Sequence, residues 1–334
     1  MSERMTMPHN HSNPSWSISG WDEAVIFTDA SNRVADFLVQ IGGWKQTYAG
    51  PLDPAWFNFW SIPSTSVAYE RVIQSEIDHH GSLRFITITP ASSIAIRADC
   101  QPWDSGGIFD LNIRVKNLEQ LMPKMRQWGW QSMTNPYRFT FGQFEVIEWI
   151  VKDASGITLA FIERLAPPLK HLTFEVMSHA FNSTQVVRDF SVAFSFYTDV
   201  LGFTSYLSHR GKSQAPGHNV FGLPYNIAME IERKVEILHP QGLNEGSIEL
   251  LSFEGLEGKD VTAHAMPPHL GVNALRMEVT GLSDLHKHIC KVYEKDLISD
   301  IHSLLLCPKG NLNIFSVYTP DGVRLELYEL LKST

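Results

Sequence analysis

The hydrophobic and polar positions of the chain predict one supersecondary unit that recurs four times. Each unit consists of a strand, then a helix with apolar residues on one face, then further strands separated by turns. The clearest helix is expected within residues 189–203, where apolar residues recur at helical spacing. Asp189 is a suitable N-cap for it, and Gly202 stands where the helix should end. A repeat of this kind constrains the fold more than any single motif does.

The units are expected at residues 22–89, 106–162, 181–253 and 274–328. Three of them carry a glycine and an aromatic residue directly after the helix, and the fourth does not. In the first unit, the aromatic run at residues 56–60 is predicted as a strand whose rings fill the core or an interface between units.

Together the units predict an α+β fold, in which four β-α-β-β-β modules pair into two cup-shaped domains with mixed sheets. Since short connections favour neighbours, we expect the first module to pair with the second and the third with the fourth. This predicts a disordered tail at residues 1–20, an N-terminal domain at 21–165, a proline-containing linker at 166–180 and a C-terminal domain at 181–334.

The bulk composition favours small organic molecules as partners. The 334 residues carry a net charge of −9, which argues against nucleic acid because phosphate binding needs a basic surface. No stretch approaches the ~20 apolar residues of a membrane span. The three cysteines are scattered and the N-terminus lacks the apolar core of a signal peptide, so a cytoplasmic location is expected. The oligomeric state is left open, with a homodimer as one form.

Three stretches resemble the vicinal oxygen chelate superfamily, the group of glyoxalases, bleomycin-resistance proteins and extradiol dioxygenases. They are residues 189–203, 246–251 and 320–327, and a weaker resemblance extends over residues 22–328. The resemblance implies a lyase, isomerase or ring-cleaving dioxygenase that acts on a small organic molecule in the C-terminal cup. The alternative that it implies is a metal-free protein that only sequesters a ligand, similar to bleomycin-resistance proteins.

The resemblance also implies where a site would lie. In metal-using members, ligands come from the first and last strands of two paired modules, which makes Glu249 and Glu326 the candidate catalytic residues and metal ligands. Carboxylate oxygens suit one divalent ion such as Fe, Mn, Zn or Mg. Asn182 and Ala274 stand at the first-strand positions, and an insertion in the third unit would bring His171 there instead.

Asn182, Arg276 and Asn226 are the substrate-binding candidates. Arg276 shares a strand face with Ala274, so it is also the expected ion-pair partner if Glu326 is structural. No glycine-rich phosphate-binding loop is present, so no nucleotide cofactor is expected.

The first half of the chain is expected to hold no metal, because Arg84 and Ala160 stand at its last-strand positions. Asp110, Asn112 and Arg114 alternate along one strand, and we interpret them as an outward, solvated face.

His209 and His218 lie in loop-like sequence near the C-terminal cup and are interpreted as solvated. The polar segment at residues 211–219 is either a lid over the cup or a plain connection.

Overall fold

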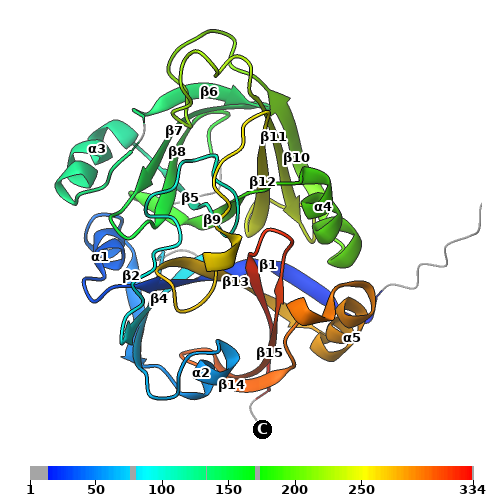
Figure 1. The fold of residues 1–334 in the computed structure, drawn as a ribbon. Coiled ribbons are helices and arrows are strands. Elements are labelled where there is room, and N and C mark those ends of the chain that lie inside the picture. The colour runs from blue at the N-terminus through cyan, green and yellow to red at the C-terminus, as the bar shows by residue number, and fades with distance from the viewer. Residues whose placement is uncertain (1–13, 76–79, 133, 170–173, 333–334) are drawn as a thin grey trace, which may run out of the picture.

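The chain folds into two eight-stranded sheets, each curved into a cup (Figure 1). The computed structural model describes residues 14–75, 80–132, 134–169 and 174–332. The largest apolar cluster contains residues of all four modules and lies between the convex faces of the sheets. This confirms the predicted α+β fold of four modules in two cups. No helix in the described ranges is long and apolar enough to cross a membrane.

Modules one and four form the first sheet, in the order β14-β15-β16-β13-β1-β4-β3-β2. Its strands are β1 (Ser17–Thr28), β2 (Lys45–Pro51), β3 (Val67–Gln74), β4 (Ser82–Thr89), β13 (Gly271–Thr280), β14 (His302–Leu306), β15 (Gly310–Tyr318) and β16 (Arg324–Leu330). The two modules meet where β1 runs antiparallel to β13, with Ala24 opposite Leu275. Side chains fill the concave face of this sheet, so we call this half the packed cup.

Modules two and three form the second sheet, in the order β10-β11-β12-β9-β5-β8-β7-β6. Its strands are β5 (Asp110–Val115), β6 (Tyr137–Phe141), β7 (Phe144–Lys152), β8 (Thr158–Ala166), β9 (Met177–Val186), β10 (Thr204–Gly211), β11 (Glu232–His239) and β12 (Ser247–Glu254). The two modules meet where β5 runs antiparallel to β9, with Asn112 opposite Asn182. A cavity lies on the concave face of this sheet, so we call this half the hollow cup.

The expected division into an N-terminal and a C-terminal domain is wrong, because module one pairs with module four and module two with module three. The connections at residues 90–109 and 255–270 are long enough to cross between the sheets, whereas the shorter connection at 167–176 joins two modules of one sheet. The two ends of the expected linker at 166–180 therefore belong to the hollow cup, since β8 ends at Ala166 and β9 begins at Met177.

The expected disordered tail is also too long. β1 begins at Ser17, and Ile18 is already buried in the central core. Residues 1–13 lie outside the described part of the chain.

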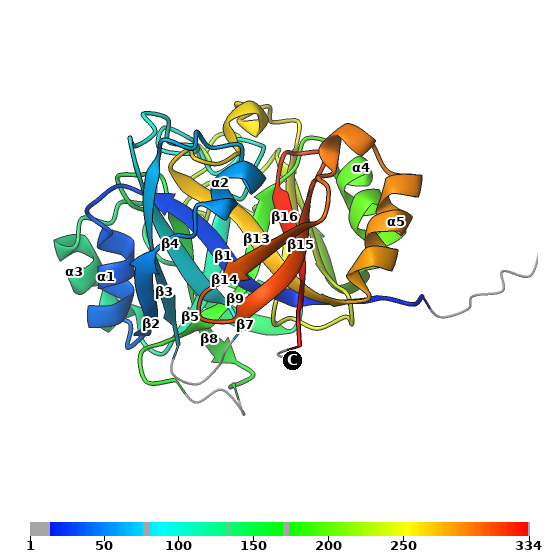
Figure 2. The same cartoon turned by 90° about the horizontal axis from the view of Figure 1, so that it is seen from below.

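Four helices lie at the two flanks of the molecule. They are α1 (Arg33–Gln40), α3 (Leu118–Gln127), α4 (Phe190–Ser195) and α5 (Leu282–Val292), and single 3-10 turns occupy Thr262–His264 and Lys295–Leu297. Figures 1 and 2 show α1 beside α3 at one flank and α4 beside α5 at the other. The ring centroids of Phe196 and Tyr293 are 4.9 Å apart and connect the second pair.

The helix expected within residues 189–203 is present as α4. The Asp189 carboxylate caps it by accepting hydrogen bonds from two backbone N–H groups of the first turn, at 2.9 and 3.1 Å. The chain continues as a wider π-type turn, Phe196–Val200, and the helix ends before Gly202, whose φ of 72° favours glycine.

The aromatic run at residues 56–60 forms a short helix, α2 (Ala55–Phe59), and not the expected strand. The four buried rings are those of Trp56, Phe57, Phe59 and Trp60. Only Asn58 between them is exposed, a pattern that one helical turn produces and an alternating strand does not. The core position expected for these rings is confirmed, since they fill the packed cup.

Glu326 lies in a buried ion network of the packed cup. Its carboxylate accepts hydrogen bonds from Arg276 Nε at 2.8 Å and from Arg324 Nε at 3.0 Å. The indole N–H of Trp60 donates to it at 2.6 Å. Burial alone would raise the pKa of Glu326, but the two arginines hold it below its ordinary value. Glu326 therefore has its counter-charges inside the protein, and Arg276 is the ion-pair partner that the structural alternative expected.

The network continues across both modules of the packed cup. Arg276 Nη1 contacts Glu23 at 2.5 Å, and Arg84 Nε contacts the same carboxylate at 2.8 Å. Arg84 also pairs with Glu70 at 2.5 Å. Matched charges and the rings of α2 thus occupy the concave face of this sheet.

Replacing Glu326 by Gln should lower the free energy of unfolding by about 3–5 kcal/mol, because buried Arg324 loses its carboxylate partner and Arg276 loses one of its two. Urea denaturation at neutral pH measures the change. Glu278→Gln is the matched control, since Glu278 is exposed on β13, and it should change the value by less than about 0.5 kcal/mol. Equal stability of the Glu326→Gln protein and the wild type would contradict the structural role.

Candidate functional site

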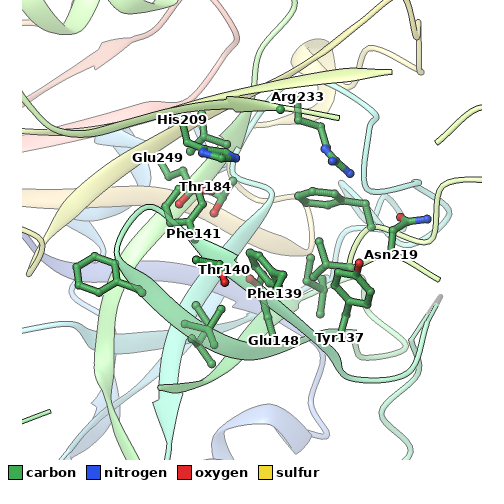
Figure 3. Close-up of a pocket in the computed structure, with 18 of the residues that line it drawn as sticks. Tyr137, Phe139, Thr140, Phe141, Glu148, Thr184, His209, Asn219, Arg233 and Glu249 are labelled. Carbon is green, nitrogen blue, oxygen red and sulfur yellow. The ribbon is translucent and has the colours of Figure 1, made fainter. Parts of the chain in front are cut away.

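The hollow cup encloses a cavity of about 650 Å³, a size that suits a small organic molecule (Figure 3). Aromatic side chains form much of its wall, among them Tyr137, Phe139, Phe141, Phe144, Phe181 and Phe221. The strands of both modules and the segment at residues 211–219 contribute to the lining.

The two edge strands of this sheet approach each other and nearly close the cup. The rings of Phe141 on β6 and His209 on β10 have centroids 5.0 Å apart. Tyr137 and His218 make a second contact at 5.8 Å. The segment at 211–219 therefore lies over the cavity. His209 is half-buried on β10 and lines the cavity, contrary to the solvated loop position expected for it, whereas His218 lines the cavity and is exposed, as expected.

Three carboxyl groups face the cavity, from Asp110 on β5, Glu148 on β7 and Glu249 on β12. Strand register brings two of them together, because Thr184 on β9 lies opposite Asp110 on one side and Glu249 on the other. The amide of Asn112 supports this arrangement by donating to Thr184 Oγ1 at 3.0 Å.

Asn182 belongs to the same hydrogen-bonded group as Asn112 and Thr184. Its side-chain oxygen accepts a hydrogen bond from the Asn112 amide at 2.6 Å, and its own amide donates to Ser247 Oγ at 2.7 Å. Asn182 lines the cavity at the strand position counted from Asp189 without an insertion. His171, the alternative for this position, lies outside the described residues.

The pKa values of these carboxyl groups are raised. Burial raises the pKa of Asp110 to about 7, although the hydrogen bond from Thr184 and the charge of Arg97 oppose the shift. Burial and the charge of Asp110 raise the pKa of Glu249 to about 8. Burial and both other carboxyl groups raise the pKa of Glu148 well above its ordinary value. Among the residues described, none of the three forms an ion pair.

The donor set does not match the divalent metal that the resemblance implies. Within the described ranges, no three His, Cys, Asp or Glu side chains are arranged so that they could hold one ion. Thr184 and Asn182 stand on the strand between the carboxyl groups, and their neutral oxygens are weak ligands for such ions.

The structure separates the two glutamates that were expected to form one site. Glu249 lines the hollow cup, whereas Glu326 and Arg276 lie in the packed cup, because their modules pair with different partners. Asn226 is exposed and does not line the cavity.

The interpretation of Asp110, Asn112 and Arg114 as an outward face is wrong. β5 lies in the middle of the sheet, and its alternate residues Leu111 and Ile113 fill the core between the sheets. The polar residues must therefore face the cup, where Arg114 pairs with Glu245 at 2.7 Å.

Glu148 was missed by sequence reasoning. It stands between Ile147 and Trp149 in an apolar strand. A carboxyl group in such a position indicates a buried partner or a polar cavity, and this was the signal that could have found it. Glu249, in contrast, was singled out by the resemblance.

Comparisons with known proteins identify the fold. No protein-family model matches the sequence, and no curated protein matches it in a sequence comparison. Among solved structures, glyoxalase I from Zea mays superposes with a TM-score of 0.60 at 12% identity, covering 94% of this chain and 93% of that one. A protein from Bacillus subtilis, named provisionally as a dioxygenase, superposes with a TM-score of 0.57 at 11% identity, covering 94% and 86%.

These similarities confirm the expected resemblance at the level of the fold: the chain has the fold of vicinal oxygen chelate proteins, in a single chain of four modules. At this identity the likeness carries no substrate or reaction to the chain.

Glu249→Gln should make the folded protein more stable than the wild type at high pH. The folded state holds a proton on Glu249 between its ordinary pKa of 4.5 and about 8, so the stability of the wild type falls as pH rises through this window. A glutamine side chain does not titrate, so the variant does not lose stability in this pH window. Between pH 5 and 9, the free energy of unfolding of the variant should rise by about 2 kcal/mol relative to that of the wild type. This is less than the full pKa shift implies, because the cavity admits solvent.

Urea denaturation at pH 5, 7 and 9 measures this difference. Glu254→Gln, on the exposed end of the same strand, should follow the wild type at each pH. A constant difference between Glu249→Gln and the wild type across this range would show that Glu249 titrates normally.

Proposed function

We propose that the hollow cup is the active site of a lyase or isomerase that moves a proton on a small organic molecule. The observation that carries this proposal is the group of carboxyl side chains with raised pKa values inside an aromatic cavity. A carboxyl group whose pKa lies near the working pH is suited to general acid–base catalysis.

Asp110 and Glu249 are the proposed acid–base pair. Their charges interact, so between about pH 7 and pH 8 the pair mainly holds one proton, which resides on Glu249. Ionised Asp110 takes a proton from a carbon next to a substrate carbonyl, and Glu249 gives its proton to the carbonyl oxygen. The resulting enol regains a carbon-bound proton from Asp110, and Glu249 takes back the proton of the oxygen.

Glu148 has a different proposed part. Its pKa is raised by burial and by the other two carboxyl groups, so it stays protonated and donates a hydrogen bond to a substrate oxygen. Asn112 and Thr184 are hydrogen-bonded to each other between the two residues of the acid–base pair and help to position them. Among the activities expected from the resemblance, the donor set favours a lyase or isomerase over a ring-cleaving oxygenase.

The test follows carbon-bound protons of a panel of aryl hydroxyketones by NMR in deuterated water. The wild-type protein should accelerate exchange of the proton next to the carbonyl for at least one compound. Glu249→Gln and Asp110→Asn should each lower the exchange rate by about 10²–10⁴-fold, because each removes one proton-transfer group.

Glu254→Gln is the control for exposed charge on the same strand and should retain the wild-type rate. Treatment with EDTA should leave the rate unchanged. Full exchange activity in both Glu249→Gln and Asp110→Asn would overturn the assignment of the pair.

A ligand-sequestering protein is the second candidate. The near closure of the cup by the Phe141–His209 contact and by the segment at 211–219 favours it, since enclosure suits retention of an apolar compound. Binding of panel compounds by the wild type without any exchange would support this candidate and contradict the enzyme.

A further inference from the structure

The hollow cup has a cationic region that the acid–base pair does not use. Arg233 on β11 and His209 on β10 lie on neighbouring strands, and both line the cavity. Within the described ranges, the Arg233 guanidinium makes one hydrogen bond, a long one to Ser213 Oγ at 3.3 Å. In the part of the chain that the structure describes, no carboxylate pairs with either side chain.

Most other cations near the cavity have partners or solvent; the exception is Arg164, which lies over the Phe144 ring at 3.8 Å and whose Nε has no hydrogen-bond partner among the residues described. Arg114 pairs with Glu245 at 2.7 Å, and Arg210 lies 3.7 Å from Glu232. Lys212 is exposed. Arg233 therefore differs from Arg114, Arg210 and Lys212 in facing the cavity without a counter-charge among the residues described, and the imidazole of His209 on the neighbouring strand can donate an N–H group beside it.

This absence of an anion has an energetic consequence. Burial lowers the pKa of Arg233, and burial together with the charge of Arg233 lowers that of His209. A partly buried guanidinium without an anion is costly, so an anionic ligand group would be stabilised here.

Aromatic rings lie between the Arg233 guanidinium and the carboxyl groups. Figure 3 shows Arg233 directed toward the side of the cavity that holds Tyr137 and Asn219, apart from Glu249 and Thr184. Phe139 lines the space between them. Ring faces of this kind favour an aromatic ligand body.

We propose that the hollow cup takes an aromatic carboxylate, whose anionic group pairs with Arg233 and His209 while its ring packs against Phe139 and Tyr137. A single carboxylate matches one planar guanidinium and one imidazole, whereas a phosphate dianion needs more donors. The proposal deepens the proposed function for the substrate class, but the binding of the anion does not depend on the acid–base pair.

Isothermal titration with the full chain at pH 7 tests it, with biphenyl-4-carboxylate and its neutral isostere biphenyl-4-carboxamide as probes. The wild type should bind the carboxylate at least about tenfold more tightly than the amide. Arg233→Gln should weaken carboxylate binding by about 10–100-fold and leave amide binding unchanged. His209→Gln should lower the same preference and provides a second variant if Arg233→Gln fails to fold.

Two control variants test whether the preference for the anion belongs to Arg233 and His209. Arg138→Gln removes an exposed arginine of β6, paired with Glu145 at 2.6 Å, and should keep the full preference. Glu249→Gln should also keep it, so loss of proton exchange and loss of anion binding are distinguished.

Three results would overturn the proposal. One is equal affinity of the wild type for the carboxylate and the amide. Another is tighter binding of biphenyl-4-yl phosphate than of the carboxylate, which would assign a different anion. The third is loss of the preference in Arg164→Gln but not in Arg233→Gln, since Arg164 lies elsewhere in the cavity, over the Phe144 ring at 3.8 Å.

Discussion

The structure depends on the two antiparallel contacts between first strands, β1 with β13 and β5 with β9. Each of these strands lies in the middle of its sheet and is buried on both faces. One face contributes to the apolar core between the sheets, and the other faces the inside of a cup. Because side chains alternate along a strand, polar residues excluded from the core must point into the cup. The positions of Asp110 and Asn112 follow from this constraint.

The pKa values of buried carboxyl groups are shifted in opposite directions in the two cups. In the packed cup, Arg276 and Arg324 lower the pKa of Glu326, and Arg276 also pairs with Glu23 of module one. In the hollow cup, Glu249 has no cationic partner among the residues described, and burial raises its pKa to about 8. The same fold thus contains a carboxylate that contributes to stability and a carboxyl group that can exchange its proton near neutral pH.

Much of the local structure was predictable because it depends on residues that are close in the chain. The helix after Asp189 and the strands that carry Glu249 and Glu326 are present where the periodicity indicated. The errors arose where the local pattern admits two interpretations. The aromatic run at 56–60 fits a helical turn as well as a strand, and the stripe from Asp110 to Arg114 has the same alternation whether it faces solvent or a cavity.

The sequence by itself determined the four-module repeat, the fold class and the presence of carboxyl groups within apolar strands. Only the tertiary structure decided which modules pair, because strand pairing joins residues far apart and the cost of closing a loop grows slowly with its length. That pairing decides which side chains share a cavity. It places Glu249 with Asp110 and Glu148 and assigns Glu326 to a separate cup, an outcome that no local pattern contains.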